Sequence, residues 1–510
     1  MRRRAYLTAA TTVLAISALC SLALAAHGAQ PASLLDAARV LAAAPYQPPG
    51  ADLPPPFAGL SYDAYRAIRP AAGRAAMLPV GPAFAADLLP PGLYFPNPVV
   101  IELPKKDGGF SQKIFAASLF EYSPQYFSPQ DPGSIPDKVR SAGFSGLRLR
   151  HPLNASGLMD EVLVVQGASY FRAIGQAMAY GLSARAVAIG TGGPKAEEFP
   201  RFTQLRVYAA TGDAIRLEAV IDSPSLAGHL DMTLRPGLDT ETDIAVTLMP
   251  RQDIRTIGVA PLTSMFFKGP MRSAVADDYR PRVHDSNVLV IENGAGEQLW
   301  RPLANPASLQ TSAFLDDSPS AFGLWQTPRS FADYQDSEAR YHDRPSARVV
   351  PSHDWGPGAV MLVEIPTADE FMDNIVAFWR PARSLAAGSE HRFAYRISWS
   401  RGAPLPGLPA PVRQSLSGRE HDQPGTRRFV VDFAGDHAGL TPDLSASGDV
   451  TLSGPSMFPL PDGQGTRVTF LLSPGMRDSV ELRLLLRDGS GAAASPVWLY
   501  RWTQPRDDGV

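Results

Sequence analysis

Cysteine is almost absent from this chain, since its 510 residues contain one, Cys20. Cys20 falls within a leader-like N-terminal segment, so we expect a mature protein without disulfides or cysteine-ligated metal. No apolar run after that segment is long enough to span a membrane. An excess of one charge is also lacking, because 47 basic residues nearly balance 50 acidic ones. This balance argues against nucleic acid as a partner and favours a neutral ligand such as a sugar.

The motifs that mark common catalytic and cofactor sites are missing as well. The sequence has no Walker loop, no strand-initiated GxGxxG, no HExxH and no GxSxG. Nine histidines occur, but none stands at metal-ligand spacing with another ligand. Gly190–Gly193 lacks the following Lys-Ser/Thr of a phosphate loop, so a plain turn is the better interpretation. We therefore expect neither a cofactor nor a metal ion.

The N-terminus has the layout of an export signal. Three arginines, Arg2–Arg4, precede an apolar stretch at 9–25, and small residues suited to cleavage follow. We assign residues 1–29 to a signal peptide. The run from Arg3 to Leu7 approximates the twin-arginine pattern, and an ordinary Sec signal is the alternative.

The rest of the chain has the pattern of a β-rich protein. After a short amphipathic helix at 32–44 and a helical turn at 61–66, alternation predicts strands at 146–150, 230–234 and 241–248. Forty-nine prolines and 43 glycines are spread along the chain and separate many short strands. Regular βαβ alternation is missing, so we expect a mainly β fold built on a large antiparallel β-sandwich.

A domain boundary is predicted near residue 400. A proline-rich linker at 401–415 would separate a large domain, 30–400, from a small one, 416–510. The small domain has turn-separated strand candidates spaced as in an immunoglobulin-like sandwich, at 428–433, 450–452, 467–472, 480–486 and 497–502.

One stretch, 279–381, concentrates the residue types of a carbohydrate site. It contains four of the seven tryptophans, Trp300, Trp325, Trp355 and Trp379, with arginines, tyrosines and carboxylates between them. Aromatic rings cover the apolar faces of sugars, and polar groups bind the hydroxyls. Paired carboxylates permit acid–base cleavage of a glycosidic bond. The plainer alternative is that the tryptophans fill the core and the acids solvate turns.

A series of segments carries a family resemblance: 57–69, 143–149, 167–173, Val283-His-Asp-Ser-Asn287, 300–303, 344–346, 355–356, 363–367 and 373–377. In this order they resemble the OpgG/OpgD (MdoG/MdoD) family of periplasmic glucan biosynthesis proteins. The resemblance implies a galactose-mutarotase-like β-sandwich followed by an immunoglobulin-like one. It also implies a periplasmic location and action on the β-1,2-glucan backbone. The twin-arginine-like signal makes the chain more like the OpgD type.

Site residues follow from the resemblance by position. Asp373 takes the role of general acid, and Asp285 that of the carboxylate on the base side. Tyr341 and Glu370 take supporting roles. From the composition of the stretch 279–381, and not from family position, we expect glucan contacts at Trp300, Arg301, Trp325, Arg344, Trp355 and Trp379. Inversion needs one protonated carboxyl and one ionised carboxylate, with a nucleophile between them. The resemblance implies a proton relay through a substrate hydroxyl. We expect both aspartates to open into one cleft of the large sandwich.

Three functions stay open at this point. The first is an inverting β-1,2-glucanase, and the second is a transglycosylase that cyclises the same glucan. The third is a non-catalytic glucan-binding partner of the membrane glucan glucosyltransferase. The presence of both Asp285 and Asp373 favours the first two. Val288 stands where the family usually has glycine, which leaves the balance of hydrolysis and transfer open. A homodimer is also left open.

Overall fold

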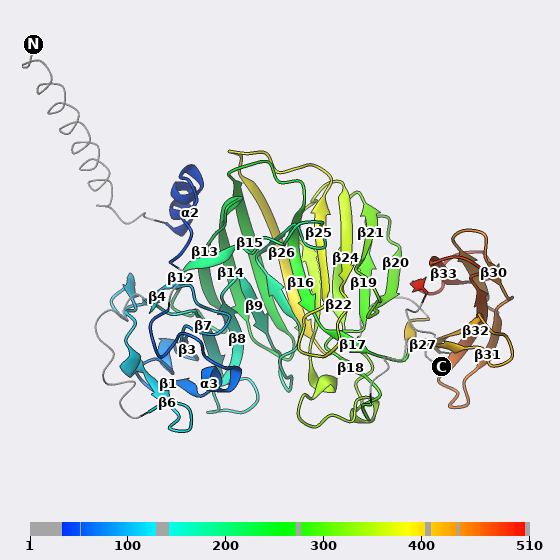
Figure 1. Cartoon of the computed structure of the whole chain (residues 1–510), viewed down its shortest axis with the longest axis horizontal. Helices are drawn as coiled ribbons and strands as arrows, with labels where there is room; N and C mark the ends of the chain where they lie inside the picture. Colours follow the sequence, from blue (N-terminus) through cyan, green and yellow to red (C-terminus); the bar gives the residue numbers. More distant parts are fainter. Residues whose placement is uncertain are drawn as a thin grey trace, which may run out of the picture.

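A computed structural model describes residues 33–50, 53–128, 142–271, 277–402, 410–435 and 439–504. The regular secondary structure of these ranges is almost entirely β-strand (Figure 1). The signal peptide predicted at 1–29, with its twin-arginine pattern, lies outside them. No helix in these ranges combines the length and the apolar character that a membrane crossing requires.

Two large sheets form the body of the molecule (Figure 1). The eleven-stranded sheet runs in the order β2 (Leu78–Gly81), β3 (Phe84–Leu89), β7 (Gly146–His151), β8 (Asp160–Gln166), β9 (Tyr170–Ala173), β10 (Ser183–Arg185), β16 (Ile257–Ser264), β25 (Ile375–Pro381), β24 (Gly358–Glu364) and β21 (Gln310–Asp316), and β11 (Val187–Ile189) also pairs with β16. The fourteen-stranded sheet runs in the order β29 (Thr441–Ala446), β33 (Ser479–Arg487), β34 (Val497–Thr503), β20 (Gln298–Pro302), β19 (Val288–Glu292), β22 (Ala321–Trp325), β23 (Ser346–Pro351), β26 (His391–Ser400), β15 (Thr240–Pro250), β14 (Leu226–Arg235), β13 (Ile215–Asp222), β12 (Arg201–Val207), β4 (Val100–Pro104) and β5 (Phe110–Gln112).

Alternating side chains pack the main core. In β15, Thr242, Ile244, Val246 and Leu248 are buried, and the residues between them are partly exposed, as the alternation at 241–248 predicts. Neighbouring strands are antiparallel, except for the parallel pairs β4–β12 and β20–β34. The predicted mainly β fold, with a large antiparallel sandwich, is confirmed.

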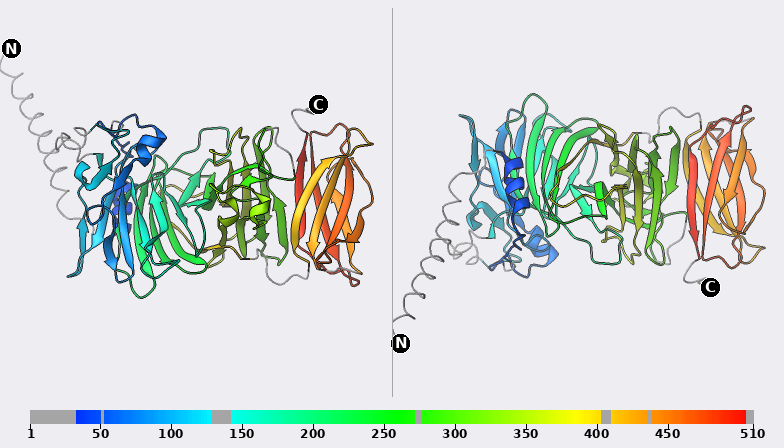
Figure 2. Two further views of the ribbon diagram at one scale, coloured as in Figure 1. Left: turned by 90° about the horizontal axis from the view of Figure 1, so that it is seen from below. Right: turned by 90° about the horizontal axis from the view of Figure 1, so that it is seen from above.

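A smaller sandwich lies at the C-terminal end of the elongated molecule (Figure 2). Its second sheet contains β27 (Val412–Arg419), β28 (Arg427–Ala434), β32 (Gly465–Ser473), β30 (Thr451–Leu452) and β31 (Ser456–Pro459). This sheet packs on β33 and β34 through Phe429, Phe470 and Trp498. Each of the five strand candidates predicted for this region is a strand.

The two sandwiches share one sheet. Strand β34 runs parallel to β20, with Leu299 opposite Val497 and Trp300 opposite Trp498. Residues 403–409 of the predicted linker lie outside the described ranges. Strand β27 begins at Val412, so the last part of that linker is strand, because Val412 and Ser415 turn into the small core. The division into domains stays a prediction.

Short elements complete the chain. Helix α2 (Leu34–Ala43) is capped by the Ser33 hydroxyl, which accepts from Asp36 N–H, and it packs Leu34 and Ala38 on the fourteen-stranded sheet. The remaining elements are α3 (Tyr62–Arg66), η1 (Ala117–Leu119), η3 (Phe331–Asp333), η4 (Tyr341–Asp343) and two small sheets, β1 (Ile68–Pro70) with β6 (Phe120–Tyr122) and β17 (Phe266–Lys268) with β18 (Val283–His284).

Candidate active site

Asp285 lies directly after the β17–β18 hairpin. Its N–H donates to Met265 O over 2.8 Å, which ties it to the residue between β16 and β17. The preceding His284 is fully buried, and its ring stacks on Phe266 with centroids 5.4 Å apart. Asp285 itself is only 5% exposed. The hairpin therefore fixes this carboxylate and restricts its contact with water.

Asp373 is held through its neighbour Asn374. The buried amide of Asn374 accepts from Phe266 N–H over 2.8 Å and donates to Phe266 O over 3.0 Å. It also donates to Ile365 O over 3.0 Å. Met265 and Phe266 are thus the common support of two aspartates that are far apart in the sequence.

The Asp285 carboxylate has a cationic partner. Arg344 Nη1 donates to Asp285 Oδ1, and the guanidinium lies over the Tyr341 ring, 4.3 Å from its centroid. Desolvation raises the pKa of Asp285, and the charge of Arg344 opposes that rise. On balance the pKa of Asp285 stays raised, and the ion pair with Arg344 limits the rise because it favours the ionised form.

The Asp373 carboxyl has a different environment. Asp373 is in contact with solvent. Among the described residues, none shifts the pKa of this carboxyl through a hydrogen bond. The surrounding protein desolvates it and raises its pKa, and repulsion from Asp285 raises the pKa further. Three arginines, Arg172, Arg185 and Arg344, oppose this rise. Two carboxyls in unlike environments suit one proton donor and one acceptor.

Glu370 belongs to a charged network beside the two aspartates. Arg280 pairs with Glu370 over 2.6 Å, with Asp336 over 2.8 Å and with Asp278 over 2.9 Å. The charge of Glu370 contributes to raising the pKa of Asp285. Arg280 therefore joins three loops around the site and holds Glu370 in place.

Gln326 connects the segments that carry Asp285 and Tyr341. Its Nε2 donates to His284 O over 2.7 Å and to Tyr341 O over 2.8 Å, which leaves Oε1 to accept from His284 Nδ1 over 2.7 Å. Desolvation lowers the pKa of His284 to about 3, so the ring is neutral and carries its proton on Nδ1. Tyr341 is buried, and desolvation raises its pKa.

Several residues of this site were missed in the sequence. Arg172, Arg185, Arg280 and Gln326 were not predicted. The dense charge at 277–282 could have drawn attention to Arg280. Nothing local marks Gln326, because its role depends on hydrogen bonds to residues distant in the sequence.

The four predicted tryptophans lie in packed cores. Trp300 and Trp325 belong to the core between the two sandwiches. Trp355 and Trp379 contact each other in the main core, with ring centroids 6.4 Å apart. Strand alternation turns these large rings inward, where burial stabilises the fold. Their placement corresponds to the plainer alternative, and we do not propose them as stacking platforms.

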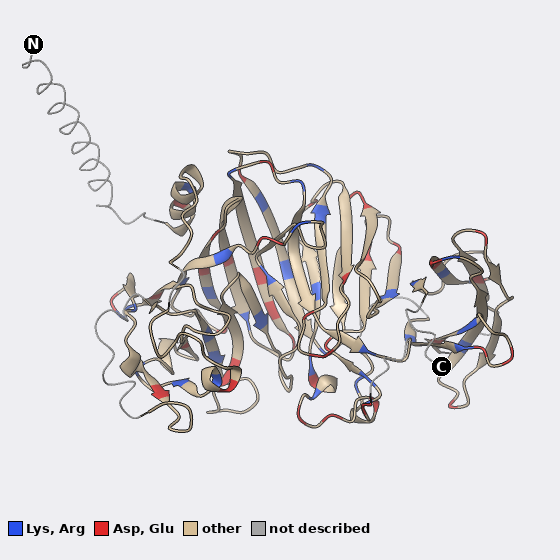
Figure 3. Ribbon diagram, in the orientation of Figure 1, with Lys and Arg blue, Asp and Glu red and all other residues tan. Residues whose placement is uncertain are grey.

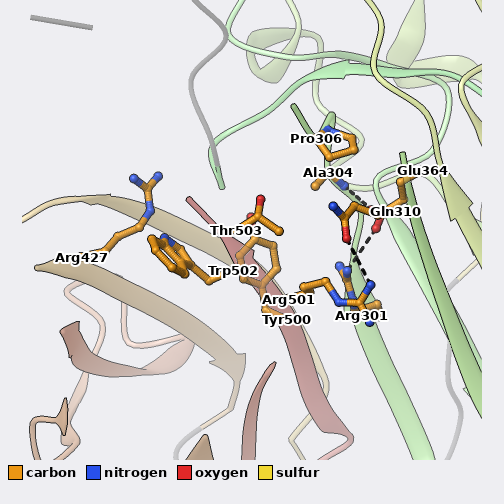
Figure 4. A pocket seen from close by; sticks show the side chains of 10 residues that line it. All are labelled: Arg301, Ala304, Pro306, Gln310, Glu364, Arg427, Tyr500, Arg501, Trp502 and Thr503. Atoms are coloured by element: carbon orange, nitrogen blue, oxygen red, sulfur yellow. Dashed lines mark hydrogen bonds and ion pairs between the residues drawn. The ribbon is translucent and has the colours of Figure 1, made fainter. Parts of the chain in front are cut away.

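Arg301 is held in a buried ion pair of its own. Figure 4 shows it in a pocket lined by residues of β20, β24 and β34, among them Glu364 and Tyr500. Its Nη2 pairs with Glu364 Oε2 over 3.1 Å, and each residue is 2% exposed. Of the six residues expected to contact glucan, the structure brings Arg344 alone into contact with Asp285.

The charge distribution agrees with a neutral ligand. Figure 3 shows acidic and basic side chains interleaved over the strands and loops. Within the described ranges, no group of three or more histidine, cysteine or carboxylate side chains is arranged to hold a metal ion.

Comparison with known proteins identifies relatives over most of the chain. The family model "Periplasmic glucan biosynthesis protein, MdoG" matches residues 30–502. Glucans biosynthesis protein G of Vibrio cholerae serotype O1 (strain ATCC 39541) is 42% identical over 477 residues, which cover 91% of this chain and 85% of the relative. The protein of the same name from Shewanella sp. (strain W3-18-1) is 41% identical over 476 residues, with 91% and 85% covered.

Among solved structures, a galactose mutarotase-related enzyme from Lactobacillus acidophilus matches with a TM-score of 0.22 and 9% identity, covering 51% of this chain and 97% of that one. A likeness at this level carries no argument here. The curated relatives are named for the G type, so the preference for the D type stays a prediction. The family predicted from the sequence is confirmed: the chain belongs to the MdoG family of periplasmic glucan biosynthesis proteins.

Proposed function

We propose that this protein is an inverting β-1,2-glucanase that acts in periplasmic glucan biosynthesis. Its substrate is the β-1,2-glucan backbone, and residues 1–29 direct its export. The observation that carries the proposal is the asymmetry of the acid pair. Both carboxyls are desolvated, but Asp285 is 5% exposed and paired with Arg344, whereas Asp373 keeps contact with solvent and is repelled by Asp285.

This asymmetry assigns the two catalytic roles. Asp373 retains a proton and donates it to the glycosidic oxygen as the bond breaks. Asp285 stays ionised and accepts the proton of the attacking water, directly or through a substrate hydroxyl. The arginine beside Asp285 stabilises the charged carboxylate before the reaction, and proton transfer to Asp285 neutralises it.

The neighbouring residues support these roles. Tyr341, under the guanidinium of Arg344, orients that arginine toward Asp285. Glu370, fixed by Arg280, raises the pKa of Asp285 and so increases the affinity of this base for the proton that it accepts. Arg172 acts on the pKa of both aspartates and balances the negative charge of the site.

A second candidate function is transglycosylation, in which a glucan hydroxyl replaces the attacking water. The 5% exposure of Asp285 favours it, because a nearly buried base receives a proton more readily from a bound sugar than from bulk water.

The membrane glucan glucosyltransferase and a second copy of this chain are the further partners we propose.

The test is an incubation of the purified protein with linear β-1,2-glucan, read by mass spectrometry and by a reducing-end assay. Hydrolysis adds one water and one reducing end for each bond cleaved. Cyclisation by transglycosylation breaks one glycosidic bond and forms another, so it takes up no water, leaves the number of reducing ends unchanged and yields cyclic glucans that are one water lighter than linear chains of the same length. Unchanged glucan masses, matching an Asp373→Asn control, would contradict both enzymatic functions and leave a glucan-binding role.

A further inference from the structure

The loop between β24 and β25 is fixed at its first end by Asn305. Thr367 N–H donates to Asn305 Oδ1 over 3.0 Å, and Asn305 Nδ2 donates to Thr367 O over 2.9 Å. The Thr367 hydroxyl then donates to Asp369 O over 2.8 Å. These bonds give the loop a defined backbone without help from apolar packing.

The same loop is fixed at its far end and in its middle. Asn374 is bonded to Phe266 and Ile365, and Glu370 is paired with Arg280. Between these anchors, Phe371 N–H donates to Asp369 Oδ1 over 2.9 Å. The backbone that carries Phe371 is therefore held in one conformation.

Although its backbone is held in this way, Phe371 is 90% exposed to solvent. Burying a phenyl ring away from water stabilises a folded protein. The ring of Phe371 contributes almost none of this stabilisation in the free protein. It stands between Glu370 and Asp373 in the sequence, on the segment that presents the general acid. A rigid loop thus displays an apolar ring beside the bond-breaking carboxyl.

We propose that Phe371 is a stacking platform for a glucosyl ring bound next to the bond that Asp373 protonates. This inference rests on the proposed function and adds a binding residue to it. The apolar face of a glucose unit covers the ring, and the neighbouring carboxylates bind its hydroxyls. Holding the ring in advance reduces the entropy lost on binding.

A sugar suits this position better than a protein surface does. Protein interfaces bury broad apolar patches. In the sequence, Phe371 lies between Glu370 and Met372, which is 43% exposed, with Asp369 and Asp373 one position further out on either side. A single ring among carboxylates is the composition of a polyol subsite.

The test measures binding of linear β-1,2-glucan by titration calorimetry in an Asp373→Asn background, so that turnover does not interfere. Adding Phe371→Ala should weaken binding about tenfold, which corresponds to about 1.4 kcal/mol. Phe371→Trp should restore it. Phe458→Ala, which removes an exposed phenyl from β31 of the small sandwich, is the matched control and should leave the affinity unchanged.

Two results would overturn the inference, and they differ from each other. If the background protein binds glucan and Phe371→Ala binds it equally well, the platform is wrong while the proposed function stands. If the background protein binds no β-1,2-glucan, the proposed function fails and the platform fails with it. A self-association of the protein that Phe371→Ala abolishes, with unchanged glucan affinity, would identify Phe371 as a contact between copies and contradict the platform.

Discussion

The side-chain amide of Asn374 and the main chain of Phe266 are joined by two reciprocal hydrogen bonds, of 2.8 and 3.0 Å. The neighbouring Met265 accepts from Asp285 N–H. One dipeptide therefore supports both members of the acid pair, and the position of Asp373 depends on an amide that never touches substrate.

Asn374→Ala should lower kcat about a hundredfold, since a misplacement of about 1 Å at a catalytic group costs that much. Glucan affinity should change little. Steady-state kinetics and calorimetry check both values, and Asn293→Ala, which removes an amide that caps the β19–β20 turn, is the control. Asn374→Asp keeps the acceptor for Phe266 N–H and guards against misfolding of the alanine variant. A folded Asn374 variant with wild-type kcat would show that this support is not needed.

Arg344→Lys should lower kcat/KM by about two orders of magnitude, although the positive charge is kept. Lysine has no planar fork to cover the Tyr341 ring and reach Asp285 together. Because Asp285 loses a fixed counter-charge, its pKa rises and the acidic limb of the pH–rate profile moves to higher pH. A profile that coincides with that of the wild type would exclude Arg344 from the control of Asp285.

Asp373→Asn should make the protein slightly more stable at pH 7, because solvent in contact with this exposed residue screens most of the effect. The pKa of Asp373 is raised above 3.8 in the fold, so the folded state binds a proton that the unfolded chain has already lost. Wild-type stability consequently falls as pH rises through the interval between 3.8 and the raised pKa, and the variant lacks this loss. Urea unfolding at a series of pH values checks it. Equal pH dependence in the two proteins would contradict the assigned shift.

The buried pair of Arg301 and Glu364 should be structural. Arg301→Met or Glu364→Leu alone should lower the free energy of unfolding by about 3 kcal/mol, because each leaves one buried charge without its partner. The double variant Arg301→Met/Glu364→Leu should regain most of this loss. The exposed pair Arg39–Glu390 is the control, and breaking it should matter little. Losses that simply add in the double variant would contradict the coupling.

The fold was predictable where sequence alternation is strict. Period two in 241–248 reflects one buried face, and turns rich in glycine and proline delimit the C-terminal strands. The parallel pairing of β34 with β20 was not predictable, because the chain-distant contact of Trp300 with Trp498 leaves no local pattern.

Some residues of the candidate site could be predicted from the sequence, and others could not. Asp285 and Asp373 were assigned by family position, and Arg344 from the composition of 279–381. Contacts with one another or with shared neighbours bring the three together. The tryptophans were assigned from composition, which cannot distinguish a ring on a surface from a ring in a core. Phe371 escaped notice because its exposure is a property of the folded loop.

The most direct test of the account compares wild-type protein and Asp373→Asn on linear β-1,2-glucan, with initial rates from released reducing ends and affinity from calorimetry. If Asp373 donates the proton, the initial rate of the variant falls by a factor of about 10²–10⁴ or more, and its dissociation constant for glucan stays nearly unchanged. An Asp373→Asn variant that releases reducing ends at the wild-type rate would contradict the central claim.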